Sequence, residues 1–217
     1  MKNWRAHFLL LPVLIPLFLA IGCKSTYYSA WEKFGVYKRD LLKKRVTEAR
    51  DEQKAAGAQF KDAMTRLKEL YGFDGGRLEK AYSTLQKDFD RCAEKAGAVQ
   101  KRIRDVESVA QDLFAEWEKE IKQIATPALA DSSRNQLRDT RARYDQMHDA
   151  LRKAEQSMEP VLVKFRDHVL YLKHNLNAQA IASLKGEATN IQAEISRLIA
   201  DMNSSIAKAD EFIKTMP

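Results

Sequence analysis

Histidine side chains are the groups with which this chain could most readily hold a metal ion. Beyond residue 22 the histidines are His148, His168 and His174. His168 and His174 are six residues apart, so they point about 240° apart around a helix and cannot share one ion. Di-iron bundles use Glu-x-x-His pairs, and the nearest pattern is a single Asp145-Gln-Met-His148. The spacing predicts no metal site, and a hydrogen-bonded core position for His168.

Carboxylates gather in EWEKE, residues 116–120. Glycosidase-type acid–base chemistry needs two carboxylates that face one cleft, whereas neighbouring helical residues diverge by about 100°. The chain also has no Gly-rich phosphate loop, no Gly-x-Ser-x-Gly motif and no Cys–His pairing. An enzyme would need a polar pocket around His168, His174 and Glu116. We expect no catalytic activity, no cofactor and no small-molecule substrate.

The first 22 residues have the parts of an export signal. Two basic residues, Lys2 and Arg5, precede an apolar run at residues 8–19, and small residues follow. The run is shorter than the roughly 20 residues that a membrane-spanning helix needs. We expect residues 1–22 to be a cleaved signal peptide and residues 23–217 to form one elongated helical domain.

Cys23 ends the motif Leu19-Ala20-Ile21-Gly22-Cys23, which resembles the lipobox of bacterial lipoproteins. In such proteins the thiol receives a diacylglycerol, and cleavage leaves the cysteine as an acylated first residue. Several acyl chains together hold a protein stably on a membrane. The resemblance implies the outer membrane, facing the periplasm, because Lys24 replaces the aspartate that tends to retain such proteins in the inner membrane. A plain cleaved signal is the alternative.

If Cys23 is lipidated, Cys92 is the only other thiol, so no intramolecular disulfide can form. Cys92 falls on an apolar series of helical period, which predicts a small core residue.

The positive charge is concentrated directly after the expected anchor. Residues 24–50 contain eight basic and three acidic residues, which is a net charge of +5, and the rest of the mature chain is balanced. Anionic headgroups attract such segments, although an ordinary solvated helix face has the same composition. Nucleic acid is not an expected partner, because export removes the protein from the compartment that holds nucleic acid. The expected anionic-surface residues are Lys38, Arg39, Lys43, Lys44 and Arg45.

Apolar residues recur with a helical period through the mature chain, which predicts an all-α fold. The clearest series alternates steps of four and three, as in a coiled-coil seam. Its members are Leu78, Tyr82, Leu85, Phe89, Cys92, Ala96, Val99, Ile103, Val106, Ala110, Leu113 and Trp117. An earlier series has the same spacing and comprises Leu42, Val46, Ala49, Gln53, Ala56, Phe60, Ala63, Leu67 and Leu70. The glycines of YGFDGG, residues 71–76, predict a tight reversal between the two.

Pro127 is expected to stop the second helix, with Asp131, Ser132 or Ser133 as the cap of the next. A third series comprises Thr140, Tyr144, Met147, Leu151, Ala154, Met158, Val161, Phe165, His168 and Leu172. Pro160 lies inside it and predicts a kink. A fourth, out of phase with the third, comprises Leu184, Ala188, Ile191, Ile195, Leu198, Met202, Ser205, Ala209 and Phe212.

The phase slip between residues 172 and 184 decides the architecture. If the chain reverses at HNLN, residues 174–177, four long helices form an elongated antiparallel bundle. Their expected ranges are about 28–71, 77–124, 132–175 and 179–215. If the chain only bends there, three helices result and the last one is bent. Matching lengths favour four helices.

Residues 165–188 are the least heptad-like part of the chain, which suits a turn, a helix buried all round, or a docking surface for another copy or an envelope partner. This stretch, with EPVLVKFRDHVLYLKHNLNAQAIASL and VESVAQDLFAEWEKEI, resembles a family of uncharacterised bacterial lipoproteins that carry a domain of unknown function. The resemblance covers most of the mature chain. It implies an all-helical envelope domain and supplies no activity.

The anchor, the seams and the missing catalytic motifs favour a non-enzymatic outer-membrane lipoprotein, a coiled-coil scaffold or adaptor that binds the membrane surface or envelope partners. One alternative is a periplasmic chaperone or assembly factor, which needs exposed apolar stripes beyond the seams. Another is a membrane-bending module built from long, kinked helices that dimerise.

Overall fold

The computed structural model describes residues 37–72 and 78–216. Cys23, the expected signal peptide and the expected helix start at residue 28 lie outside these ranges. Within them every regular element is a helix and no residue lies in a strand, so the predicted all-α fold is confirmed. Residues Lys38–Pro217 form one compact unit.

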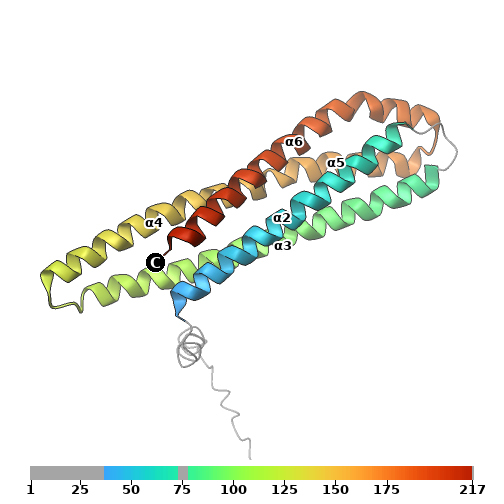
Figure 1. Ribbon diagram of the computed structural model, residues 1–217. Coiled ribbons are helices and arrows are strands. Elements are labelled where there is room, and N and C mark those ends of the chain that lie inside the picture. The colour runs from blue at the N-terminus through green and yellow to red at the C-terminus, as the bar shows by residue number, and fades with distance from the viewer. Residues whose placement is uncertain (1–36, 73–77, 217) are drawn as a thin grey trace, which may run out of the picture. The chain divides into compact units, whose positions relative to one another are not determined.

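The described residues form five helices (Figure 1): α2 (Lys38–Tyr71), α3 (Leu78–Ile121), α4 (Pro127–Gln156), α5 (Met158–His174) and α6 (Ala178–Thr215). α2 and α3 lie side by side, α6 packs against α2 and α4, and α5 packs against α3 and α6. The predicted count of four is therefore not met, because the third long helix is divided into α4 and α5.

The chain reverses between α5 and α6, so the alternative of a single bent third helix is wrong. Lys153 pairs with Asp201, and Lys164 pairs with Glu194. The numbers rise along α4 and α5 while they fall along α6, which makes α6 antiparallel to both (Figure 1). The Asn177 side chain caps α6 by accepting a 2.9 Å hydrogen bond from the N–H of Ala180.

All residues are buried in the predicted series that begins at Leu42, here called the first seam, and in the one that begins at Thr140, the third seam. In the fourth seam, which begins at Leu184, every residue whose side chain is described is buried as well. In α3 the buried residues Leu78, Leu85, Cys92, Val99 and Val106 keep a strict spacing of seven. The next position, Leu113, is only half-buried, and Phe114 is buried in its place. A straight helix drifts about 20° per heptad relative to a 3.5-residue repeat, so over 44 residues the buried face moves to the adjacent residue.

The kink expected at Pro160 lies three residues earlier, at Ser157, which separates α4 from α5. Proline has no N–H to donate to the carbonyl four residues before it, and its ring displaces that carbonyl. The affected carbonyl belongs to Gln156, the last residue of α4. The helix therefore breaks where the bond is lost.

The predicted start of the helix after Pro127 is wrong. α4 begins at Pro127 itself, five residues before the expected boundary, and Thr126 is its N-cap in an extended conformation. Proline suits the first helical position because that N–H has no intrahelical partner and its φ is already helical. Asp131 instead pairs with Arg134, and Ser133 accepts a hydrogen bond from Trp117 of α3.

Candidate functional site

The basic residues at the start of α2 divide into two groups. Lys38 donates to Glu116 of α3 at 2.6 Å, and Arg45 donates to Glu48 at 2.9 Å. Glu48 also accepts from Arg102 of α3 at 3.0 Å. Lys38 therefore joins α2 to α3 directly, whereas Arg45 pairs within α2 with the carboxylate that Arg102 of α3 also reaches.

Arg39, Lys43 and Lys44 form the second group, and all three are exposed. Arg39 lies 4.0 Å from the carboxylate of its neighbour Asp40. Lys43 and Lys44 make no ion pair with any residue in the described ranges. Of the five expected anionic-surface residues, these three face outward, and the other two are half-buried in ion pairs.

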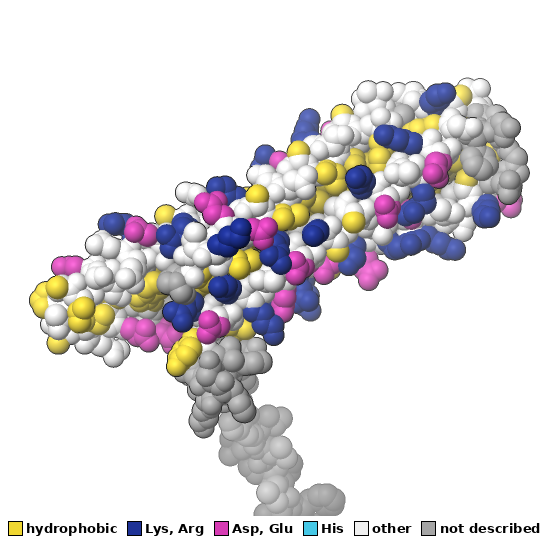
Figure 2. All heavy atoms as spheres, in the orientation of Figure 1, with side chains coloured by type: hydrophobic (Ala, Val, Ile, Leu, Met, Phe, Trp, Pro, Cys, Tyr) yellow, Lys and Arg dark blue, Asp and Glu magenta, His cyan; other side chains and the backbone are white. Residues whose placement is uncertain are grey.

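Further along α2, charges are paired across helices. Arg50 contacts Asp210 of α6 at 2.7 Å, and Glu52 contacts Lys95 of α3 at 2.8 Å. Figure 2 shows Lys and Arg side chains interspersed with Asp and Glu side chains on this face of the molecule. The mixture leaves no extended surface of one sign on that face, so attraction to a polyanion depends on local groups of cations.

His168 is a hydrogen-bonded core residue, as predicted. Its Nδ1 lies 3.3 Å from the hydroxyl of Tyr71 at the end of α2, and both residues are buried. Burial lowers the pKa of His168, and the nearby carboxylates of Glu187 and Asp167 oppose that shift. Burial also raises the pKa of Tyr71. The pair is a neutral contact between α2 and α5.

The structure does not bring Glu116 and His168 together. Glu116 pairs with Lys38 at the start of α2, whereas His168 contacts Tyr71 at its end. At 1.5 Å per residue, the two ends of this helix are about 50 Å apart. Across the two described ranges, no three His, Cys, Asp or Glu side chains lie close enough together to hold a metal ion.

Cys92 is a fully buried free thiol, as the seam predicted. Burial, together with the nearby Asp88 carboxylate, raises its pKa to about 12. Asp88 was not expected in the core, yet it is fully buried and accepts a 2.5 Å hydrogen bond from Arg66 of α2. Arg91, one helical turn on, lies 3.6 Å from the same carboxylate. The charge is tolerated because two cations reach it.

An open groove of about 510 Å³ runs between α3 and α4. Phe114 and Tyr144 meet edge to face on its floor, and Arg141 lies over the Phe114 ring at 5.0 Å. On one side the ring of His148 stacks on Tyr144, and its Nε2 lies 2.7 Å from Glu107 of α3. His148 is thus a contact between helices, and sequence spacing had not paired it with Glu107.

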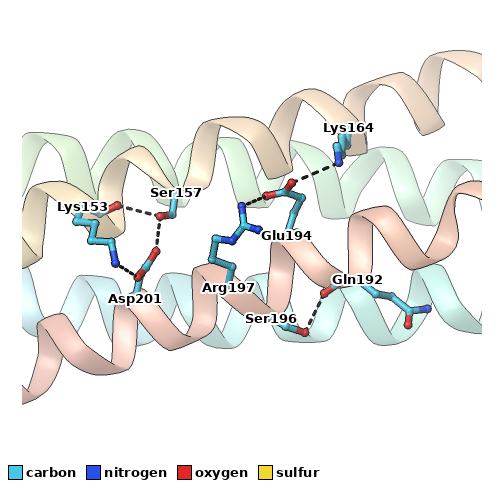
Figure 3. Close-up of polar contacts among 8 residues, drawn as sticks. All are labelled: Lys153, Ser157, Lys164, Gln192, Glu194, Ser196, Arg197 and Asp201. Atoms are coloured by element: carbon cyan, nitrogen blue, oxygen red, sulfur yellow. Dashed lines mark hydrogen bonds and ion pairs between the residues drawn. The ribbon is translucent and has the colours of Figure 1, made fainter.

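A polar layer joins α6 to the break between α4 and α5 (Figure 3). Asp201 accepts from the hydroxyl of Ser157 at 2.6 Å and pairs with Lys153 at 2.7 Å. Burial raises the pKa of Asp201, but the bonds from Lys153 and Ser157 outweigh it, so the pKa lies below its ordinary value. Two turns before Asp201, Glu194 lies 3.5 Å from Lys164. The period of the apolar residues gives no signal for this layer.

The stretch at residues 165–188, which the sequence predicts as a turn, a buried helix or a docking surface, carries exposed apolar side chains. Leu170 and Tyr171 are exposed near the end of α5, and Leu176 is exposed in the turn to α6. The same stretch buries His168 and Leu172. Residues 165–188 therefore comprise the end of α5, a short turn and the start of α6, and they carry both buried and exposed side chains, so they are not a helix buried all round.

None of the described helices is both long enough and apolar enough to cross a membrane. The chain matches no curated protein and no solved structure at a significant level. A family model described as a protein of unknown function (DUF2959) matches residues 27–216, which include the whole helical bundle. The chain belongs to this family, whose domain has no assigned function.

Proposed function

We propose that the protein is a non-enzymatic helical scaffold of the bacterial envelope, anchored by a lipid on Cys23 and resting on an anionic surface through Arg39, Lys43 and Lys44. The observation that supports it is the division of the basic residues at the start of α2. Lys38 and Arg45 are half-buried in ion pairs, whereas Arg39, Lys43 and Lys44 point outward, Arg39 beside the exposed Asp40 and the two lysines without an ion pair to a described residue.

The sequence separation from the anchor supports the same proposal. Lys38 follows Cys23 by fifteen positions, and an extended chain of that length spans at most about 50 Å. The first turns of α2 thus stay within reach of the bilayer that holds the lipid. Each cation near an anionic surface contributes about 1 kcal/mol, so three of them favour contact by roughly 100-fold.

Co-sedimentation with vesicles tests the surface contact. The full chain with Cys23→Ser is mixed with vesicles of phosphatidylglycerol and phosphatidylcholine, and the bound fraction is compared among variants. Reversing Arg39, Lys43 and Lys44 to Glu should reduce binding strongly. The matched control reverses Lys54, Lys61 and Lys68, which are also exposed on α2, and should keep most of it. Equal losses in both variants would reject the local contact.

The anchor needs its own measurement. Mass spectrometry of the protein from its native membrane should find the chain starting at Cys23, with a mass increase equal to a diacylglycerol and an acyl group. An unmodified Cys23, or a chain cleaved elsewhere, would remove the anchor from the proposal.

A chaperone is the second candidate, and the exposed group of Leu170, Tyr171 and Leu176 favours it. A holding function predicts that the protein suppresses the aggregation of an unfolded client, and that Leu170→Ser with Tyr171→Ser weakens this suppression. Unchanged aggregation in the presence of a molar excess of protein would discard it.

A membrane-bending module is the third candidate, and the break at Ser157 favours it because such modules use kinked helices. It predicts a dimer in solution and tubulation of vesicles by the lipidated chain. A monomer that leaves vesicles spherical would contradict it.

A further inference from the structure

The end of the bundle where α5 turns into α6 presents a group of exposed apolar side chains. Leu170, Tyr171 and Leu176 are 48%, 40% and 38% exposed. In the described ranges the other exposed large apolar residues are Tyr37 and Leu129, which are far from each other in the sequence. Three of five such residues thus fall within seven positions.

Exposed basic residues lie close to this group in the sequence. Arg166 lies four residues before Leu170 and Lys173 three residues after it, so both share its face of α5. Arg166, Lys173 and Lys185 are exposed and make no ion pair with a residue that the structure describes. The exposed acidic residues are Asp167 and Glu187, of which Glu187 accepts a 2.8 Å hydrogen bond from Asn190. The exposed cations therefore outnumber the exposed carboxylates in this stretch.

The combination fits a lipid surface better than a protein partner. Protein interfaces are depleted of lysine at their buried centre, and two of the three cations here are lysines. At a bilayer surface, by contrast, Tyr and Leu lie among the headgroups while Lys and Arg extend their charges toward the phosphates. We propose that this end of the bundle is a lipid contact, in which Leu170, Tyr171 and Leu176 enter the headgroup region of an anionic bilayer.

This contact is separate from the one at the start of α2. The Tyr71–His168 pair fixes the end of α2 beside α5, one turn before Leu172, whereas Arg39, Lys43 and Lys44 lie at the opposite end. The length of α2 separates the two surfaces by about 50 Å. The proposal goes beyond the anchored scaffold, since a bundle with lipid contacts at both ends either lies along one bilayer or joins two.

A fluorescent probe at the turn tests the contact directly. The full chain with Leu176→Cys is labelled with a nitrobenzoxadiazole dye and bound to vesicles that carry nitroxide-labelled phosphatidylcholine. Asn203→Cys, an exposed position in the middle of α6, is the matched control. The unsubstituted chain measures any labelling of Cys23, and the buried Cys92 stays unlabelled in the folded protein. Both label sites are exposed, so the fold should be kept, which circular dichroism checks.

We expect quenching at residue 176 to exceed that at residue 203 by at least about threefold on vesicles with phosphatidylglycerol, and to fall on purely zwitterionic vesicles. Leu170→Ser with Tyr171→Ser should abolish the excess. Leu129→Ser, which changes an exposed leucine outside the group, should keep it.

Three results would overturn the lipid contact. Equal quenching at residues 176 and 203 would mean that the turn does not touch the bilayer. A change in dye emission that depends on protein concentration and needs no vesicles would make a second copy the occupant. Failure of the chain to bind any vesicle would remove both lipid contacts. Failure of the α2 contact alone can be distinguished from these results. In that case, reversing the charges of Arg39, Lys43 and Lys44 would leave the binding to vesicles unchanged, and the quenching at residue 176 would persist.

Discussion

The Asp201 carboxylate of α6 accepts a 2.6 Å hydrogen bond from the hydroxyl of Ser157, the single residue that separates α4 from α5. Lys153, one turn before Ser157, pairs with the same carboxylate at 2.7 Å. α6 thus holds the broken helix at the point where Pro160 removes a backbone bond.

Asp201→Ala should lower the free energy of unfolding by about 1–3 kcal/mol, because a charged acceptor with two donors is lost. Asp210→Ala is the control, since the Asp210 side chain is 44% exposed and its partner Arg50 also contacts Asp51. We expect that change to cost less than about 1 kcal/mol. Urea unfolding measures both, and equal losses would show that Asp201 has no special role.

The pH dependence of the Asp201 contribution has a defined sign. Its pKa is lower in the folded protein than in the unfolded chain, so the unfolded chain takes up the proton first as the pH falls. The stabilisation is present above about pH 4 and is lost as the pH falls through the lowered pKa. The difference in stability between the natural chain and Asp201→Ala should therefore shrink below that pH.

Ser205→Ala should stabilise the protein. The hydroxyl of Ser205 is fully buried on the fourth seam and has no hydrogen-bond partner in the described structure. An unsatisfied buried polar group costs about 1–3 kcal/mol, and alanine is also the better helix former. We expect a gain of about 1 kcal/mol. Ser204→Ala, an exposed neighbour, should gain only the helix propensity, and thermal unfolding compares the two.

Two glycines in helix interiors should respond in opposite ways. A Cβ on Gly97 of α3 would meet nothing within 4 Å, whereas one on Gly57 of α2 would lie 3.2 Å from the sulfur of Met202 of α6. Gly97→Ala should stabilise by about 0.5–1 kcal/mol through helix propensity. Gly57→Leu should destabilise by about 1–3 kcal/mol, because the side chain forces α2 and α6 apart. Chemical denaturation of both variants checks the signs, and a stable Gly57→Leu would show that α6 is not tightly packed there.

His168 should make the protein less stable on mild acidification. Its pKa is lowered in the folded state, so the unfolded chain binds a proton first as the pH falls below about 6.5. The free energy of unfolding should then decrease toward lower pH. His168→Gln should flatten this slope. A slope unaffected by His168→Gln would contradict the burial argument.

The sequence by itself determined which residues form the core of most helices. A side chain recurring every three or four residues faces one side of a helix, so the first and third seams and the described part of the fourth follow from spacing alone. Pattern reasoning also located the reversal near Asn175 and the core positions of Cys92 and His168. Helix caps and breaks were less well predicted. The N-cap of α4 is Thr126, where Asp131, Ser132 or Ser133 was expected, and the helix breaks at Ser157, where a kink at Pro160 was expected.

Only the tertiary structure decided which charged residues form ion pairs with residues of other helices. Lys38 and Lys43 look alike in the sequence, but α3 brings Glu116 to Lys38, while no described carboxylate pairs with Lys43. The same holds for Asp88, which is buried because α2 supplies Arg66, and for Asp201, which is held by Ser157 and Lys153. Pairing depends on contacts between residues tens of positions apart, and the period of apolar residues along one helix carries no information about them.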